Sequence, residues 1–190
     1  MTNTYAVSNL RQTNWSTVPK GSGYYRWYFP EPSLRPLGLE TLPQQAELKL
    51  HLIEHNGMLY YGFYFGIAKS LRERVTWHSA QPLKRSALKS GFLSTFRFSL
   101  LALLDLEYSE SGQRALDDFM NHLFIEWTET STKAEAEAVE RAELRGELTY
   151  PINLQGNKTP GARAYVRDLK QKRKQYKAHW LQQVTLANAP

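Results

Sequence analysis

The chain has 190 residues, of which 42% are hydrophobic and 22% are charged, and this composition is ordinary for one soluble globular domain. It contains no cysteine, which excludes disulfide bonds, thiolate zinc sites and cysteine nucleophiles. The formal net charge of +6 favours a polyanionic partner, nucleic acid before an anionic membrane, although such a charge also aids solubility. No apolar run is long enough to span a membrane, and no apolar stretch follows a basic start as in a signal peptide, so we expect a cytoplasmic protein.

The first third of the chain predicts strands on either side of an inserted loop. The aromatic segment that begins at Gly23 is stopped by prolines, which cannot donate to a sheet ladder. Asn56-Gly57 is a strong hairpin signal, since both residues tolerate positive φ. In chain order the residues predict an irregular polar segment at 1–20, a strand at 23–29 and a proline-rich loop at 30–45. A strand at 47–53, a turn at 56–57 and its return strand at 58–65 follow.

The rest of the chain predicts mainly helices. Ser70 and Ser94 are suited to cap two of them, and Thr132-x-x-Glu135 is a capping-box pattern for a third. In chain order the residues predict a helix at 70–79, a basic loop at 80–92, a buried helix at 95–106 and a short helix at 112–120. They then predict a strand at 122–128, a helix at 134–147, a polar loop at 154–160 and a basic helix at 161–182. These elements predict an α/β (α+β) fold in one domain, in which a small, mainly antiparallel sheet is flanked by helices.

A metal-binding pattern in the second predicted strand is a false signal. His51-Leu-Ile-Glu-His55 has the letters of an H-x-x-E-H metalloprotease motif, but that motif needs a helix, where positions four apart are neighbours. On a strand two such histidines lie roughly 13 Å apart, at about 3.3 Å per residue. They could not share one zinc ion, so we expect no zinc site here.

The strand that ends at Tyr64 leads through Gly66 into a helix with a suggestive pair of side chains. Arg74 and His78 are four positions apart and therefore share a side of that helix. An arginine fork suits a phosphate, and a histidine can exchange a proton near neutral pH. The alternative is an arginine on a solvated helix face. The earlier strand begins Gly23-Tyr24-Tyr25, so two strands could bring a tyrosine to the same helix start, unless both tyrosines are core aromatics.

The helix predicted at 134–147 offers carboxylates for a divalent cation. Mg²⁺ often uses one protein carboxylate together with water and substrate phosphate. Most of these glutamates are expected to be surface charges, and spacing alone does not choose among them. Asn153, which follows Pro151, is suited to a cap or a turn. The candidates are Glu135, Glu137, Glu140, Glu143 and Glu147.

Together these parts resemble the GIY-YIG nuclease superfamily. Gly23-Tyr24-Tyr25 matches its first motif with Tyr in place of Ile, and Tyr64-Phe65-Gly66 matches its second with Phe in place of Ile. Arg74 lies eight residues past Gly66, where the family has its essential arginine, and His78 lies where several restriction-type members have a histidine. The segment 136–140, followed by Pro151-Ile152-Asn153, resembles the family's glutamate helix and its asparagine.

The resemblance covers residues 20–158, which would form the nuclease core, with 159–190 as a basic C-terminal helix and tail. The gap between the two tyrosine motifs is longer than in compact members and holds the proline-rich loop and an extra strand. Ile67 replaces the lysine that the family has after its second motif, and Lys69 is a candidate substitute. The segment Ser94 to Arg97 is similar to stand-alone bacterial members, and Arg97 is expected either to reach the site or to be a buried structural arginine.

The resemblance implies metal-dependent hydrolysis of DNA phosphodiester bonds in restriction, defence or DNA processing. Mg²⁺ or Mn²⁺ would be held by Glu140, with Glu143 as the alternative ligand. Arg74 would bind the scissile phosphate, and Tyr25 would activate water, with Tyr64 orienting it or sharing that role. His78 would assist proton transfer or bind phosphate, and Asn153 would orient nearby groups.

The expected partner is double-stranded DNA, with a homodimer as an option and no membrane. The last helix concentrates basic residues beside a partial apolar stripe, a pattern that favours packing on one face and contact with a DNA backbone on the other, although a solvated run of charges is the alternative. The residues expected to contact DNA are Lys69, Arg97, Lys158, Arg163, Arg167, Lys170, Arg173 and Lys174.

Two further functions stay open at this level. A nuclease-like fold without activity would bind nucleic acid in a salt-sensitive way and cleave nothing with any divalent metal. A basic interaction domain for a protein or an anionic membrane would bind its partner without regard to Mg²⁺ or DNA. The combined presence of two tyrosines, an arginine and a glutamate favours the nuclease.

Overall fold

The computed structural model describes residues 4–146, 148–157 and 160–186 and confirms the α/β (α+β) fold. Five strands form one sheet, and every neighbouring pair is antiparallel. Across the sheet the strands are β1 (Thr4–Ala6), β5 (Phe124–Glu129), β2 (Gly23–Pro30), β4 (Met58–Ala68) and β3 (His51–His55). The central strand β2 is therefore paired on both edges, and this is the strand that carries Tyr25.

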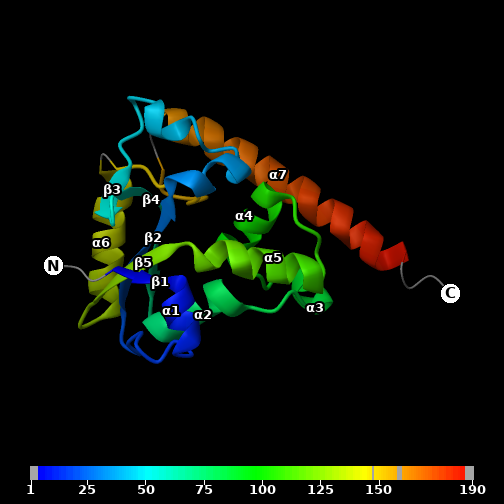
Figure 1. The fold of residues 1–190 in the computed structure, drawn as a ribbon, viewed down its shortest axis with the longest axis horizontal. Coiled ribbons are helices and arrows are strands. Elements are labelled where there is room, and N and C mark those ends of the chain that lie inside the picture. The colour runs from blue at the N-terminus through cyan, green and yellow to red at the C-terminus, as the bar shows by residue number, and fades with distance from the viewer. Residues whose placement is uncertain (1–3, 147, 158–159, 187–190) are drawn as a thin grey trace.

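Helices cover both faces of the sheet (Figure 1). They are α1 (Val7–Gln12), α2 (Leu71–Ala80), α3 (Arg85–Ser90), α4 (Thr95–Leu104), α5 (Glu110–Asn121), α6 (Lys133–Arg145) and α7 (Pro160–Leu186). Figure 1 shows α6 on one side of the sheet and α4 and α5 on the other, with α7 running diagonally as one long helix. No helix among the described residues is both long enough and apolar enough to cross a membrane.

The alternation of side chains along β2 explains why two layers of helix pack on the sheet. Successive residues of a strand point to opposite faces. The rings of Trp27 and Phe29 contact Phe96 of α4, at centroid distances of 4.7 and 6.1 Å. Arg26, which precedes Trp27, points the other way and bonds to Glu143 of α6. Tyr25 is on the same face as Trp27, so it faces the α4 layer.

The proline-rich insertion folds against the core instead of forming an open loop. It contains three short 3₁₀ turns, η1 (Glu31–Ser33), η2 (Arg35–Leu37) and η3 (Leu42–Gln44). Four leucines of the segment 34–42 are buried at 5% exposure or less. Their burial explains how a long insertion between the two tyrosine motifs is accommodated without disturbing the central strands.

Two of the predicted elements were wrong, and the strand predicted at 47–53 lies at 51–55. Residues 1–20 were expected to be irregular, yet β1 pairs with β5, and α1 follows it with Val7 and Leu10 buried one helical turn apart. Within the predicted loop 80–92, the residues of α3 form a short helix that buries Leu88 and ends at Gly91, whose φ is +75°. In both cases only one or two buried apolar residues anchor a helix that is too short to show a periodic pattern.

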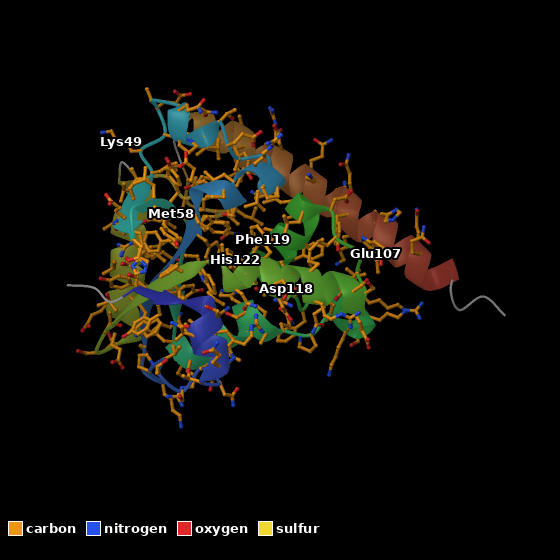
Figure 2. The ribbon with its side chains drawn as sticks, in the orientation of Figure 1. Lys49, Met58, Glu107, Asp118, Phe119 and His122 are labelled. Atoms are coloured by element: carbon orange, nitrogen blue, oxygen red, sulfur yellow. The ribbon has the colours of Figure 1, made fainter. Side chains whose placement is uncertain are left out.

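The hairpin of β3 and β4 forms an exposed edge of the sheet. His51 and His55 lie on strand β3, as expected for a segment that is not a zinc-binding helix. Figure 2 shows Met58 of this hairpin and Lys49 on one side of the molecule, and Glu107 on the opposite side. Met58 is 40% exposed and Leu52 is 50% exposed, so the edge carries apolar side chains in solvent.

Candidate active site

A cavity of about 570 Å³ brings together side chains that are far apart in the sequence. It lies where the ends of β2 and β4 meet α2, α4, α6, α7 and the segment 153–156. The polar side chains that line it include Tyr25, Tyr64, Arg74, Glu140, Asn153 and Arg173. Such a cavity is within the size range of ligand sites, and its walls carry two phenols, two guanidinium groups and one carboxylate.

A β-bulge turns Tyr64 toward Tyr25. In the β2–β4 ladder, Trp27 pairs with Tyr64 and the next residue, Tyr28, pairs with Gly62, so Phe63 is the extra residue in β4. An extra residue reverses the side on which later side chains point. Tyr64 therefore faces α4 together with Trp27, and its ring lies 6.3 Å from that of Tyr25.

Gly66 is required by the position of the Tyr25 ring. The two residues are direct partners in the ladder, so they share a face of the sheet. A Cβ atom on residue 66 would lie 2.6 Å from Cζ of Tyr25, which is closer than any ordinary contact. The tyrosine can occupy this place only because residue 66 has no side chain.

His78 lies behind Tyr25, away from solvent. It is 1% exposed, and its Nε2 atom is 2.7 Å from the Tyr25 hydroxyl, while Nδ1 is 2.6 Å from Oγ of Ser94. Burial, and then the nearby Arg74 charge, lower the pKa of His78 to about 3. His78 is thus neutral near pH 7, and it contacts the site through the phenol of Tyr25.

Both phenols are protonated near neutral pH. Burial raises the pKa of Tyr25 well above its usual range, and Tyr64 raises it further. Burial also raises the pKa of Tyr64 to about 12, although Arg74 opposes this rise. Either tyrosine would need a proton acceptor or an added positive charge to act as a base.

Arg74 is exposed at the wall of the cavity. Its Cζ atom lies 4.9 Å above the ring of Trp77, which is a cation–π distance. The N–H groups of the guanidinium are free to bind an anion, because no ion pair within the described residues involves Arg74. This arrangement fits a phosphate-binding arginine.

The structure separates Glu140 from Glu143. The Glu143 carboxylate accepts hydrogen bonds from Nη2 and Nε of Arg26, at 2.8 and 3.0 Å, and from the hydroxyl of Tyr150. Glu140 lies one turn earlier on α6 and lines the cavity instead. Burial raises the pKa of Glu140 above its usual range, and Glu137 adds to the effect. Glu140 is therefore the carboxylate available to a cation.

The cavity fits a cation that needs few protein ligands. Among the described residues there is no cluster of three or more His, Cys, Asp or Glu side chains that could hold a metal ion. The Glu140 carboxylate is half-buried and takes part in no ion pair in this part of the chain. One such carboxylate with water and phosphate oxygens is a common environment for Mg²⁺.

Comparison with known protein families assigns the chain. The profile described as the GIY-YIG catalytic domain matches residues 23–175, which is most of the sequence. The chain belongs to the GIY-YIG family. No curated protein and no solved structure matches it significantly. Membership of the GIY-YIG family indicates a nuclease of the endonuclease type, with DNA as the class of substrate and, in general, a dependence on a divalent metal.

In this GIY-YIG domain Asn153 supports the sheet. Its Oδ1 accepts from the backbone N–H of Phe65 and its Nδ2 donates to the Phe65 carbonyl, both at 2.8 Å. The side chain thus acts as an extra strand partner for β4 between Tyr64 and Gly66. Its amide is already used, so Asn153 holds the second tyrosine motif in place from the edge of the cavity.

The basic residues expected to contact DNA fall into three groups. Arg173 lines the cavity, and its Nη1 donates to the Thr95 carbonyl at 2.8 Å and to Oγ of Ser99 at 2.6 Å. Burial lowers the pKa of Arg173 to about 10, so it keeps its charge at neutral pH. The exposed side chains of α7 that were expected to bind DNA are Arg163, Arg167, Lys170 and Lys174.

The other three expected contacts differ in position. Arg97 is 1% exposed, and its guanidinium donates to the Ser79 carbonyl at 2.9 Å and to Asp117 at 2.7 Å. Of the two alternatives for Arg97, it is therefore the buried structural arginine. Lys69 lines a second hollow that shares Arg74 with the cavity. Lys158 lies outside the described residues.

One contributor was not among the sequence candidates. Ser94 was expected only as a helix cap, and its Oγ does accept from the backbone N–H of Arg97 at 3.1 Å. The same oxygen also contacts His78, and Gln81 holds the Ser94 backbone N–H at 2.6 Å. The cap signal was present in the sequence, but the contact with His78 depends on how α2 and α4 pack.

Proposed function

We propose that this chain is a divalent-metal-dependent endonuclease that hydrolyses phosphodiester bonds of double-stranded DNA, in restriction, defence or DNA processing. The observation that carries the proposal is the shared cavity lined by Tyr25, Tyr64, Arg74 and Glu140. These four side chains come from two strands and two helices, and no packing requirement of the core explains a carboxylate, a guanidinium and two phenols around one water-accessible space.

In this proposal Arg74 binds the scissile phosphate and stabilises the charge that grows on it in the transition state. Arg173 provides a second fixed positive charge in the cavity. Glu140 would hold Mg²⁺ or Mn²⁺, which when bound would polarise a phosphate oxygen and stabilise the leaving oxygen.

Tyr25 and His78 together can activate the attacking water. When His78 carries its proton on Nδ1 and donates it to Ser94, its Nε2 lone pair faces the Tyr25 hydroxyl. The water then gives a proton to the oxygen of Tyr25, whose own proton passes to Nε2, and the resulting hydroxide forms the new bond to phosphorus while the bond from phosphorus to the leaving oxygen breaks. The leaving oxygen takes a proton from solvent. A phosphate bound by Arg74 offsets one of the two causes of the low His78 pKa, so substrate binding makes His78 a better proton acceptor.

The test is incubation of supercoiled plasmid with the purified protein and Mg²⁺ or Mn²⁺. The wild-type protein should nick or linearise the plasmid, and Glu140→Ala should abolish cleavage while DNA binding persists. Glu110→Gln is the matched control, because that carboxylate is 96% exposed on α5 and lies outside the cavity. Cleavage that survives both Glu140→Ala and Arg74→Ala would refute the proposal. Salt-sensitive binding without cleavage by the wild type would favour a catalytically inactive nucleic-acid-binding protein.

A further inference from the structure

A second hollow, of about 330 Å³, borders the proposed active site at Arg74. Arg74 lines both spaces, so a group bound in the hollow would be next to a phosphate held by Arg74. The side chains that line the hollow are Lys69, Ser70, Glu73, Arg74, Trp77 and Phe92.

Phe92 is held in solvent by a fixed backbone. The residue is 73% exposed, the highest value among the exposed large apolar residues of the described chain. Its N–H donates to Oγ of Ser90 at 3.3 Å, and its carbonyl accepts from Nε2 of Gln81 at 2.8 Å. Oε1 of Gln81 also accepts from the N–H of Ser94 at 2.6 Å, so one side chain ties the loop to α2 at two points. An exposed phenylalanine on a preorganised loop is suited to a ligand contact.

Trp77 completes an aromatic platform with Phe92. The centroids of the two rings are 5.9 Å apart and their planes are inclined by 40°. Trp77 also contacts Arg74, whose Cζ lies 4.9 Å from the ring centroid. His78 also stacks against Trp77, with centroids 5.5 Å apart, so the exposed ring of Phe92 is the open surface of this wall and Trp77 continues it to the guanidinium.

The hollow carries a partner for a base as well as cations for a phosphate. Lys69 and Arg74 are cationic, but Glu73 lines the same space and would repel an anion. A nucleobase has a π face for the rings, and amino groups of adenine, cytosine or guanine can donate to a carboxylate. A nucleotide could thus place its base against the platform and its phosphate on Arg74.

We propose that the platform of Trp77 and Phe92 stacks an unpaired base of the nucleotide adjacent to the phosphate bound by Arg74. The inference rests on the proposed function and extends it to a substrate class, DNA with unpaired nucleotides beside the cleavage site. A base inside a duplex is covered by its neighbours, so it reaches the rings only from a single-stranded segment or after leaving the stack.

The experiment measures DNA affinity without metal, so that it does not depend on cleavage. The probes are a labelled single strand, the same strand in a perfect duplex, and that duplex with one unpaired nucleotide. Phe92→Ala should weaken single-strand affinity roughly five- to hundredfold and leave perfect-duplex affinity nearly unchanged, because stacking on one aromatic side chain accounts for that range. Phe92→Tyr should restore binding, whereas Phe92→Leu should not. If Phe92→Ala also weakens affinity for the duplex with one unpaired nucleotide, the stacked base can come from a duplex as an extruded base. If it weakens affinity for the single strand alone, the base comes from an open strand.

The control is Leu52→Ala on β3, because Leu52 is 50% exposed and Figure 1 shows β3 on the opposite side of the molecule from α3. Unchanged single-strand affinity in Phe92→Ala overturns the proposal, and so does full rescue by Phe92→Leu, which would indicate an apolar protein partner. The plasmid assay is independent of this result. If the wild-type protein cleaves the plasmid but Phe92→Ala does not change single-strand affinity, only the base-stacking site is refuted. If Phe92→Ala weakens single-strand affinity but the wild-type protein cleaves nothing, only the nuclease proposal is refuted.

Discussion

Three features of the fold together position Tyr25 in the candidate site. Its place in the central strand fixes its backbone, the missing side chain at Gly66 leaves room for its ring, and His78 bonds to its hydroxyl. Tyr64 has the same phenol in the same cavity, but no hydrogen bond to His78 is found for it within the described residues. In the proposed mechanism the two tyrosines therefore have unequal roles.

Tyr25→Phe should therefore reduce cleavage more than Tyr64→Phe. Loss of the hydroxyl that we propose transfers the proton is expected to lower the cleavage rate on the order of 10²- to 10⁴-fold, the usual range for general acid–base catalysis. Tyr64→Phe should cost less, since it removes an orienting group. The measurement is the single-turnover rate at saturating protein, with DNA affinity as the control for binding. Equal rates for the two variants would contradict the assignment of Tyr25 as the base.

His78 makes folding stability depend on pH. Its pKa is about 3 in the folded protein against an ordinary value of 6.5, so between these values the unfolded chain binds a proton that the folded chain excludes. The contribution of this residue is complete above about pH 6.5 and is lost as the pH falls toward 3, by up to about 1.4 kcal/mol per pH unit. His78→Gln should flatten this part of the pH profile in urea unfolding, even though its overall stability is lower. His122→Gln, at an exposed histidine of the α5 end (Figure 2), is the matched control substitution.

At the scale of elements, a polar cluster fixes α6 on the sheet. Nη1 of Arg26 donates to Glu126 at 2.6 Å, and its other nitrogens bond to Glu143. All three side chains are largely buried, at 5 to 16% exposure. Because Glu143 faces the sheet here, Glu140 one turn away faces the cavity.

Breaking this cluster should affect both stability and activity. Arg26→Met leaves two buried carboxylates without their cation, which costs on the order of 3 kcal/mol of unfolding free energy. Cleavage should fall as well, because α6 loses the ion pair that orients Glu140. Lys133→Met is the matched control on the same helix: its pair with Glu137 is exposed to solvent, so its loss should change the stability little. Urea unfolding and plasmid cleavage check the two effects, and an Arg26→Met protein as stable as Lys133→Met would contradict the role of the cluster.

Some features of these elements could be predicted from the sequence, and others could not. Period-two alternation and the Asn56-Gly57 turn predicted the hairpin of β3 and β4, and the caps Ser70, Ser94 and Thr132 predicted the starts of α2, α4 and α6, because these signals are local. The bulge at Phe63 has no local signal, since it depends on the register between β2 and β4. Spacing also could not separate Glu140 from Glu143, because the inner face of α6 is set by Arg26, which is more than a hundred residues away in the chain.

At the scale of the whole molecule, α7 joins the candidate site to a basic surface. Val166, Leu169 and Tyr176 are buried, so the helix packs through one apolar stripe. The Tyr176 hydroxyl donates to the Leu106 carbonyl at 2.6 Å and ties the helix to the chain segment after α4. Arg173 lines the cavity from the same helix, and the family match continues to residue 175. The division of the chain at residue 158 into core and tail stays a prediction.

The exposed face of α7 extends the cavity into a groove of about 570 Å³, which is lined by Arg163, Arg167 and Lys170 and by the segment 154–157. The segment 154–156 borders both spaces, so a DNA backbone held in the groove would lead toward Arg74 and Glu140. Arg167→Ala combined with Lys170→Ala should weaken binding of all DNA sequences alike. It should also reduce the slope of log affinity against log salt by about 0.9 for each phosphate that the variant no longer neutralises. Arg114→Ala is the control, because that side chain is 72% exposed on α5, outside the groove. Titrations at several salt concentrations separate the two outcomes: an unchanged slope would mean that α7 carries a solvated run of charges and that the DNA follows another face of the molecule.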